Sequence, residues 1–360
     1  MLRLLHEHGP LTRGELGALC GLSRTTLYDA VSALMANGAV LASIPETAQR
    51  KRGRPAEVLA LNPAAGLSLG IEFARRAVRV AAMDTAREIV GTVGEAHDLD
   101  APWHVRVDLA WRLADGLAGG TVRPGTFRGV AAGVVGPVAS TDRASLPAAS
   151  HHTVSTLVRE RFGARVLIDN STRLAAQAEA VWGAAAGEQN VLYLRLSHDV
   201  GGGLVIAGSL HRGAHGRSGM FGHITVDPDG SACECGAVGC LETVASIGAV
   251  LAACRAAGST AADVPGLVTA LEAGDQAAHT VLARVGTQIG RVLADVSRAV
   301  EPDVIVIGGE LADAGRALTA PIEHMLSTLG SYGVPRVLPA RLGDSGTALG
   351  AIALLQPGQR

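Results

Sequence analysis

The chain has 360 residues, of which 48% are hydrophobic and 18% are charged, and its formal net charge is −2. This length is enough for two or three domains, and the composition is that of a globular chain with a substantial core. The sequence shows no apolar run of about 18 residues and no signal-peptide pattern, so we expect neither a membrane span nor secretion. We therefore expect a cytoplasmic protein whose five cysteines stay reduced.

Two short helices joined by a tight turn are predicted near the start of the chain. A capping box, Thr12 to Glu15, opens the first of them. Ser23 caps the second helix, which ends before Gly38. Met1 lies only eleven residues before the capping box, so we expect the first helix of this module to be shortened or to begin upstream.

The second helix is predicted to read DNA. Its buried side carries leucine and valine at helical spacing, at Leu27, Val31 and Leu34. Two strands, expected at Ala39–Ile44 and Val58–Leu61, would complete a winged helix-turn-helix, whose second helix enters the major groove. The alternative is a small helical hairpin with a solvated face. The DNA-reading interpretation assigns base contacts to the polar side chains Ser23, Arg24, Thr25, Thr26 and Tyr28.

The segment between these two strands predicts a basic wing. Arg50, Lys51, Arg52 and Arg54 lie within six residues, and residues 1–58 hold seven basic and five acidic side chains. Such charge favours phosphate contacts, although a basic run is often only a solvated loop. The stretch Arg52-Gly53-Arg54-Pro55 also resembles an AT-hook core, whose arginines enter an A/T-rich minor groove. Its place after a helix-turn-helix favours contact with double-stranded DNA.

Residues 62–360 predict an α/β body with two lobes and a cleft between them. Three strands from Leu67 to Val93 are followed by alternating helices and strands, up to a helix at Ser171–Trp182. Strands between Val191 and Ala207, then long helices around Leu241–Ala257 and Asp275–Val300 and a buried strand at Val304–Ile307, repeat this order. Composition alone does not distinguish this arrangement from two Rossmann-like units. The expected domains are a head at 1–61 and lobes at 62–182 and 183–360.

Four metal-ligand residue types lie close together in the second lobe. His223, Cys233, Cys235 and Cys240 fall within eighteen residues, in a segment rich in glycine. Such a set can close a tetrahedron around one structural Zn²⁺ with no position left for water. The alternative is three buried, unliganded cysteines and a loop histidine. A Cys-x-Cys pair and a third Cys among glycines is poor core material, which favours zinc.

Several short motifs together resemble one family. They are Gly53-Arg54-Pro55, Gly136-Pro137-Val138, Gly222-His223, Ile307-Gly308-Gly309, Leu349-Gly350-Ala351 and the Cys-x-Cys-Gly-x-x-Gly-Cys-x-Glu signature that ends at Glu242. On these residues the chain resembles the ROK family (repressor, open reading frame, kinase), in its transcriptional-repressor branch. The resemblance implies an actin-like, ribonuclease-H-like body, structural zinc, a homodimer or homotetramer on a palindromic operator, and a sugar-type effector in the cleft.

The resemblance also implies effector contacts from Asn170, His223 and Glu242. The glutamate of the family's Glu-x-Gly-His motif is Met220 here, and a thioether does not accept hydroxyl hydrogen bonds as a carboxylate does. We therefore expect an effector that is either less polar than a sugar or acidic. The alternative is that the chain binds no effector and responds to a protein partner. His223 is expected to ligate zinc through one ring nitrogen and to face the cleft with the other. Glu242 is alternatively a first-turn acid favoured by the helix dipole.

The parts that the resemblance implies for phosphoryl transfer have changed. The phosphate-binding Asp-x-Gly-Gly-Thr of the family's kinases is Glu72-Phe73-Ala74-Arg75-Arg76, and their Gly-Thr-Gly-x-Gly is Ser197-His198-Asp199-Val200-Gly201. Ser171 replaces the catalytic aspartate, and Asp169 lies at the wrong position in the strand to act in its place. We expect no enzyme activity. The leading hypothesis is an effector-sensing regulator; the alternatives are a sugar kinase with an accessory head and a constitutive DNA-binding protein.

Overall fold

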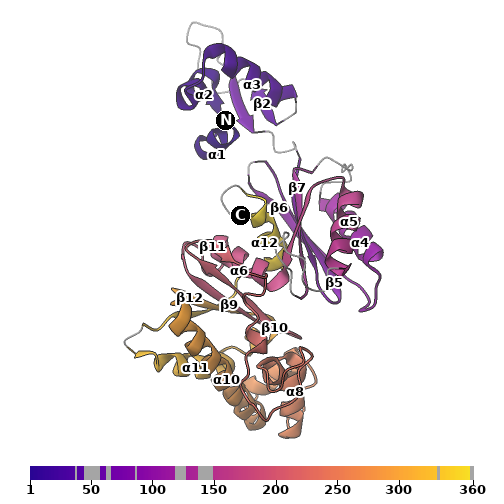
Figure 1. Cartoon of the computed structure of the whole chain (residues 1–360), viewed down its shortest axis with the longest axis vertical. Helices are drawn as coiled ribbons and strands as arrows, with labels where there is room; N and C mark the ends of the chain where they lie inside the picture. Colours follow the sequence, from indigo (N-terminus) through magenta and orange to yellow (C-terminus); the bar gives the residue numbers. More distant parts are fainter. Residues whose placement is uncertain are drawn as a thin grey trace.

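The structure is a computed structural model of the whole chain, and it describes residues 1–36, 39–43, 57–61, 66–85, 87–117, 127–136, 149–330 and 333–356. These residues form a small N-terminal head and a larger body with two sheets (Figure 1). In the described ranges, no helix combines the length and the apolar character that crossing a membrane requires.

The head consists of three helices and a three-stranded sheet. The helices are α1 (Leu2–His8), α2 (Arg13–Cys20) and α3 (Arg24–Ala36), and the strands are β1 (Leu11–Thr12), β2 (Val40–Ser43) and β3 (Val58–Leu61), in the order β1-β3-β2. The predicted capping box is present, because the Thr12 hydroxyl accepts from the Glu15 N–H at 3.3 Å and the Glu15 carboxylate accepts from the Thr12 N–H at 2.8 Å. The head therefore has the element order of a winged helix-turn-helix.

The first helix of the head, α1, was expected to be shortened, but its bounds were not predicted. It has only seven residues and no side-chain cap. Its Leu5 is nevertheless buried in the core of the head, together with Leu16, Leu27, Val31, Val40 and Leu59. A helix this short is marginal by itself, so packing on the head stabilises it rather than local sequence preference.

The first lobe is built on a five-stranded sheet in the order β6-β5-β4-β7-β8. Its strands are β4 (Ser68–Phe73), β5 (Ala77–Met83), β6 (Ile89–Ala96), β7 (Gly129–Val134) and β8 (Val166–Asn170). The pairs β4–β7 and β7–β8 are parallel, so the carboxyl ends of these three strands lie at one edge of the sheet. Helices α4 (Trp103–Leu117) and α5 (Ala149–Phe162) cover one face (Figure 1).

Two helices fill the space between the two sheets, namely α6 (Ser171–Val181) and α12 (Gly346–Leu354) (Figure 1). They cross so closely that a Cβ atom on Gly350 would lie 1.8 Å from the Leu174 carbonyl oxygen. On the first sheet, a Cβ on Gly70 would lie 1.8 Å from the Ala348 carbonyl oxygen. Glycine at these two positions therefore lets backbone meet backbone where the lobes join.

The second lobe repeats the arrangement with the sheet order β11-β10-β9-β12-β13. Its strands are β9 (Val191–Leu196), β10 (Val200–Ile206), β11 (Ser209–His211), β12 (Val304–Gly308) and β13 (Arg336–Pro339). Helices α8 (Ile247–Ala256), α9 (Val264–Glu272), α10 (Gln276–Val300) and α11 (Arg316–Ser327) enclose its main apolar core. The structure thus confirms an α/β body with two related sheets.

Several elements of the second lobe differ from the prediction. The helix expected at Leu241–Ala257 is two helices, α7 (Glu242–Ala245) and α8, because Ser246 is extended and caps α8 by accepting from the Ala249 N–H at 3.4 Å. The elements α9, α11 and β13 were not predicted. A proline inside α11 weakens the helical pattern in the sequence, whereas the proline in the first turn of α9 is compatible with a helix start.

Candidate functional site

The four predicted metal ligands converge at one point. A ring nitrogen of His223 and the three cysteine Sγ atoms all lie within 4.8 Å of one another. The distance from Cys233 Sγ to His223 Nδ1 is 3.6 Å, and that from Cys235 Sγ to Cys240 Sγ is 3.7 Å. A tetrahedral Zn²⁺ with bonds of about 2.0 Å to nitrogen and 2.3 Å to sulfur requires about 3.5 Å and 3.8 Å for these separations. The residues therefore fit a zinc ion, with Nδ1 as the histidine ligand.

Tight turns of the backbone hold the cysteines in this arrangement. The Cys233 N–H donates to the Ala237 carbonyl at 2.8 Å and the Gly236 N–H donates to the Cys233 carbonyl at 2.9 Å. Gly239 has a φ of +67°, and a Cβ there would lie 1.4 Å from the Asp227 carbonyl oxygen. Only glycine fits at that point, which explains the glycine between the second and third cysteines.

The thiols of this cluster differ in acidity. Burial raises the pKa of the Cys240 thiol to about 12, and neighbouring thiols add to the effect. Hydrogen bonding with the Ala237 backbone lowers the pKa of Cys235. A metal ion binds thiolates, so occupation of the cluster must displace a proton from Cys240 at neutral pH.

The predicted effector residues gather around the first residues of β10. Glu242, in the first turn of α7, accepts a hydrogen bond from the Val200 N–H at 2.9 Å. Gly222, which precedes His223, packs so closely that a Cβ on it would lie 2.1 Å from the Val200 carbonyl oxygen. On the other side, the Thr172 hydroxyl links Asn170 Oδ1, at 2.6 Å, to the Gly202 carbonyl, at 3.1 Å.

Asn170 has a structural task that the sequence did not indicate. It is the N-cap of α6, and its Oδ1 accepts from the N–H groups of Thr172 and Arg173. Its Nδ2 donates to the Gly136 carbonyl at 2.7 Å. The polar atoms of this side chain are therefore already engaged with the protein, which leaves less capacity for a ligand.

A buried ionic cluster lies beside this cap and was missed by the sequence reasoning. The Asp169 Oδ1 accepts from Arg173 Nε at 2.8 Å, and its Oδ2 accepts from Arg212 Nε at 2.7 Å. The Asp169 and Arg173 side chains are 4% and 2% exposed, and that of Arg212 is 29% exposed. Both oxygens of Asp169 are held by cations, so it is poorly placed to accept a proton from a substrate.

Charged side chains also connect the lobes. Arg75, in the turn between β4 and β5, contacts Asp199, in the turn between β9 and β10, through two N–O distances of 2.9 and 2.8 Å. Glu72 of β4 lies 3.4 Å from Arg195 of β9 and 3.1 Å from Arg79 of β5. Of these residues, Glu72, Arg75 and Asp199 lie in the stretches 72–76 and 197–201, which were expected to correspond to the phosphate-binding motifs of the family's kinases.

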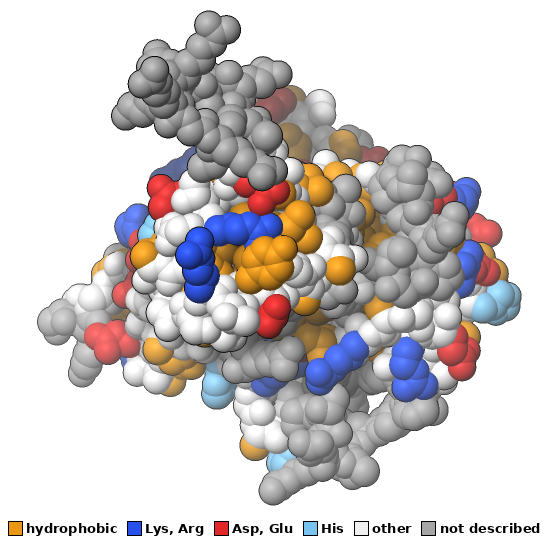
Figure 2. All heavy atoms as spheres, turned by 90° about the horizontal axis from the view of Figure 1, so that it is seen from above, with side chains coloured by type: hydrophobic (Ala, Val, Ile, Leu, Met, Phe, Trp, Pro, Cys, Tyr) orange, Lys and Arg blue, Asp and Glu red, His pale blue; other side chains and the backbone are white. Residues whose placement is uncertain are grey.

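The predicted base-reading side chains lie together on the head. Ser23, Arg24, Thr25, Thr26 and Tyr28 are all exposed, and Tyr28 is 61% exposed. Figure 2 looks down on the head and shows basic and apolar side chains side by side on its outer face. Arg13, which was not predicted to act here, places its guanidinium carbon 5.2 Å from the centre of the Tyr28 ring. The predicted wing residues Arg50, Lys51, Arg52 and Arg54 lie outside the described residues.

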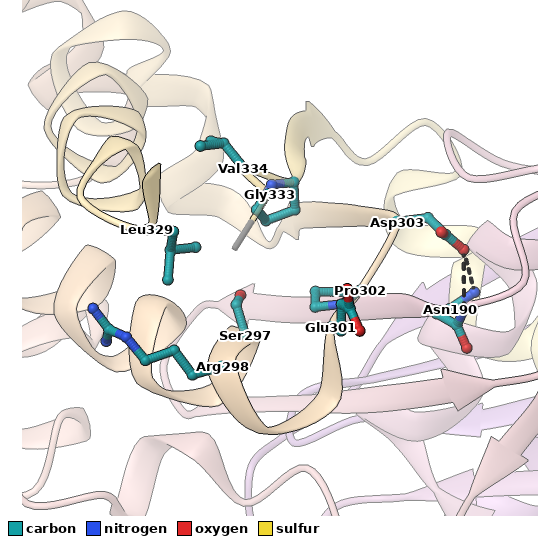
Figure 3. A pocket seen from close by; sticks show the side chains of 10 residues that line it. Asn190, Ser297, Arg298, Glu301, Pro302, Asp303, Leu329, Gly333 and Val334 are labelled. Atoms are coloured by element: carbon teal, nitrogen blue, oxygen red, sulfur yellow. Dashed lines mark hydrogen bonds between the residues drawn. The ribbon is translucent and has the colours of Figure 1, made fainter. Parts of the chain in front are cut away.

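Two surface pockets lie away from the predicted effector residues. One of about 330 Å³ lies where α10 ends, and Figure 3 shows Asn190 and Asp303 hydrogen-bonded at its side. Another of about 420 Å³ lies against β5 and β6 and includes Arg79 and Asp344. Neither is lined by Asn170, His223 or Glu242, so neither serves as the predicted effector site.

Comparison with known proteins supports the resemblance. The xylose repressor of Bacillus spizizenii is 25% identical over 99% of this chain and 93% of its own length. A glucokinase of Halalkalibacterium halodurans is 37% identical, but the match covers 48% of this chain and only 56% of the glucokinase. A crystal structure of a ROK family transcriptional regulator, homologous to the E. coli Mlc protein, superposes with a TM-score of 0.76 at 24% identity and covers 98% of this chain and 93% of that one.

The structural match shows that the head and both lobes share the fold of that regulator. The sequence model of the ROK family matches residues 113–357, which is more than half of the chain. The chain belongs to the ROK family.

Proposed function

We propose that this chain is a DNA-binding transcriptional repressor with a head at 1–61 and lobes at 62–182 and 183–360. The observation that carries the proposal is the likeness to a xylose repressor over 99% of the chain, head included. The likeness to a glucokinase covers about half of the chain, and that match does not extend over the whole length of either protein. Mapping of the bound sites across the genome tests the proposal; an absence of enriched sites contradicts it.

The head supplies the DNA contacts. The exposed face of α3 enters the major groove, with Arg24 and Tyr28 among its contacting side chains. Arg50, Lys51, Arg52 and Arg54 contact phosphates and an A/T-rich minor groove. Affinity for a palindromic duplex should fall steeply with salt, and Arg54→Ala should reduce that slope by about one. Arg255→Ala, at an exposed arginine of the far lobe, is the matched control and should leave the slope unchanged.

The cysteine cluster holds one structural zinc ion per chain. The ligand separations match a tetrahedral site, and every ligand position is filled by protein, so the ion closes the loop rather than reacting. Metal analysis of the purified chain should give about one zinc per chain. Zinc content that stays the same after Cys235→Ser contradicts this assignment.

The region around the start of β10 senses a small-molecule effector. His223 keeps Nε2 available when Nδ1 ligates the metal, and Glu242 and Asn170 lie on either side of the same strand. Binding would shift the balance between two arrangements of the lobes and so change the spacing of the paired heads. A thermal-shift screen with sugars, sugar phosphates and sugar acids tests this, because a ligand of the native state raises the unfolding temperature. No response to any class at millimolar concentration favours the alternative, a constitutive DNA-binding protein.

The chain has no sugar kinase activity. Ser171 stands where the family's kinases have their base, and the neighbouring Asp169 is held by Arg173 and Arg212. Asp199 occupies a turn that would have to approach phosphates, and it repels them. Incubation with ATP and hexoses should give no phosphorylated sugar above a protein-free blank; measurable turnover overturns the proposal.

The repressor acts as a homodimer or homotetramer in the cytoplasm. A palindromic operator presents two equivalent half-sites, which a two-fold symmetric pair of heads matches. Light scattering during gel filtration should give a mass of two or four times 36.6 kDa. A mass of one chain at the concentration that binds DNA contradicts the assembly.

A further inference from the structure

Two turns from different lobes meet across the junction of the body. Arg75 lies in the turn from β4 to β5, and Asp199 lies in the turn from β9 to β10. Arg75 Nε donates to Asp199 Oδ2 at 2.9 Å, and Arg75 Nη2 lies 2.8 Å from Asp199 Oδ1. This is the two-pronged guanidinium–carboxylate geometry, which fixes orientation as well as distance. Both side chains remain partly hydrated, at 49% and 39% exposed.

A second ion pair between the lobes lies deeper, on the strands that lead into these turns. Glu72 of β4 has a side chain that is 2% exposed, and one of its oxygens is 3.4 Å from Arg195 Nη1 of β9. Its other oxygen is 3.1 Å from Arg79 Nη1. Burial is the largest single effect and acts to lower the pKa of Arg195. The charges of Glu72, Tyr193 and Glu310 and the hydrogen bond to Glu72 together outweigh it, so the pKa is raised and the cation is retained. Arg79 belongs to the same sheet as Glu72, so the buried carboxylate keeps both of its cations only while β4 and β9 stay together.

We propose that Arg75–Asp199 and Glu72–Arg195 form an interlobe clasp that holds the two turns together without a nucleotide. The pairs Arg75–Asp199 and Glu72–Arg195 each join the first lobe to the second, so moving the lobes apart at this end must separate them. The clasp excludes polyphosphate ligands from this place. Its side chains lie between the two turns, and Asp199 presents a negative charge where a polyphosphate would require N–H groups or cations.

The two pairs differ in what they do. Separating Glu72 from Arg195 would leave a buried charge incompletely paired. This pair therefore resists separation of the lobes more strongly than Arg75–Asp199 does. The pair Arg75–Asp199 is hydrated in part, so it is the weaker one and the one that salt and movement of the lobes break first. Arg75–Asp199 therefore separates before Glu72–Arg195. The contact between the lobes at this end depends on these two ion pairs and not on a bound nucleotide.

Hydrogen exchange of the full-length protein tests the clasp. Arg75→Asp and Asp199→Arg each place like charges opposite one another; Arg75 is exposed and Asp199 is half-buried. Each single change should raise amide exchange in the partner's turn by about two- to tenfold, as expected for loss of an exposed ion pair plus repulsion. The double change Arg75→Asp with Asp199→Arg restores opposite charges and should return exchange to the wild-type rate.

The control is Arg76→Asp, which makes the same charge change on the same turn at an exposed residue whose side chain has no described ion pair. It should leave exchange at residues 197–201 unchanged. Unchanged exchange at 197–201 in Arg75→Asp, or failure of the double change to restore it, overturns the clasp. Milder changes, Arg75→Gln and Asp199→Asn, give the same test at smaller amplitude if charge reversal lowers the yield of folded protein.

The inference draws on the proposed function only for its consequence, that lobe closure is passed to the paired heads. The exchange experiment needs no DNA and no effector. If the wild-type chain does not bind DNA but the variants show the expected exchange differences, the clasp stands and the repressor assignment fails. If the wild-type chain binds DNA but the variants show no exchange differences, the clasp alone fails.

Discussion

Replacing Asp169 by asparagine should destabilise the body more than any change to an exposed ion pair. The Asp169 carboxylate is 4% exposed and is shared by Arg173, which is 2% exposed, and Arg212, which is 29% exposed. Asparagine keeps one oxygen to accept from Arg173, but its NH₂ group then faces the Arg212 Nε, donor against donor. The charge that balanced two guanidinium groups is also lost.

The magnitude follows from the burial of the two partners. Removing one partner of a buried ion pair costs about 3–5 kcal/mol, because the remaining charge is left without compensation. Arg212 can turn toward water and recover part of its hydration, so we expect the lower end, about 3 kcal/mol. With about 2–4 °C per kcal/mol for domains of 150–250 residues, the unfolding midpoint of the body should fall by about 6–12 °C.

The assay is thermal unfolding followed by circular dichroism, at equal zinc content for all variants. Arg212→Gln is the matched control, because it removes the partly hydrated partner and leaves Asp169 paired with Arg173; it should cost about 0.5–1 kcal/mol. An Asp169→Asn midpoint within about 2 °C of the wild type, or a larger loss in Arg212→Gln than in Asp169→Asn, would refute the reasoning.

Three further outcomes are expected. Gly350→Val drives a side chain into the α6 backbone and should lower the free energy of unfolding by about 3 kcal/mol or prevent folding. Gly248→Ala, where a Cβ meets nothing within 4 Å, should raise the free energy of unfolding by about 0.5–1 kcal/mol. Chemical denaturation measures both changes. Lowering the pH should release zinc, because the raised pKa of Cys240 makes protons compete with the metal for this thiol; a chromogenic chelator follows the release, and pH-independent retention contradicts the site. Tyr28→Ala should weaken operator binding by about 5- to 100-fold, the range of a lost base contact, and should lower the stability of the head by at most about 1 kcal/mol. Fluorescence anisotropy measures the affinity and denaturant unfolding measures the stability. An unchanged affinity shows that Tyr28 does not contact DNA.

Elements with strong local signals were predicted well. The strand Val58–Leu61 and the helix from Arg24 agree with the structure because a short apolar run, helical periodicity and the Ser23 cap act over a few residues. The four candidate metal ligands lie within eighteen residues, and the structure brings them within 4.8 Å of one another; their binding of zinc stays a prediction. Helix α9 was missed although Asp263 and the proline in its first turn are a helix-start signal.

The roles of buried polar residues were not predictable in this way. Asn170 was expected to contact a ligand, and this stays a prediction; its role as the N-cap of α6 was not foreseen, because it depends on where β8 ends. Asp169 was set aside as a misplaced base, whereas Arg212, 43 residues along the chain, makes it the centre of an ionic cluster. Glu72 and Arg195 are separated by 123 residues, and no pattern in the sequence pairs them.

The sequence by itself determined most of the helices and strands, the helix-turn-helix of the head and the short segment that holds the candidate metal ligands, because each depends on residues that are neighbours along the chain. Only the tertiary structure decided which charges are paired, which glycines let the lobes touch and which side chains remain available to a ligand. These depend on segments that are distant in the sequence, by 43 residues for Asp169 and Arg212 and by 123 for Glu72 and Arg195, where burial and distance fix the partner and local preference has no influence.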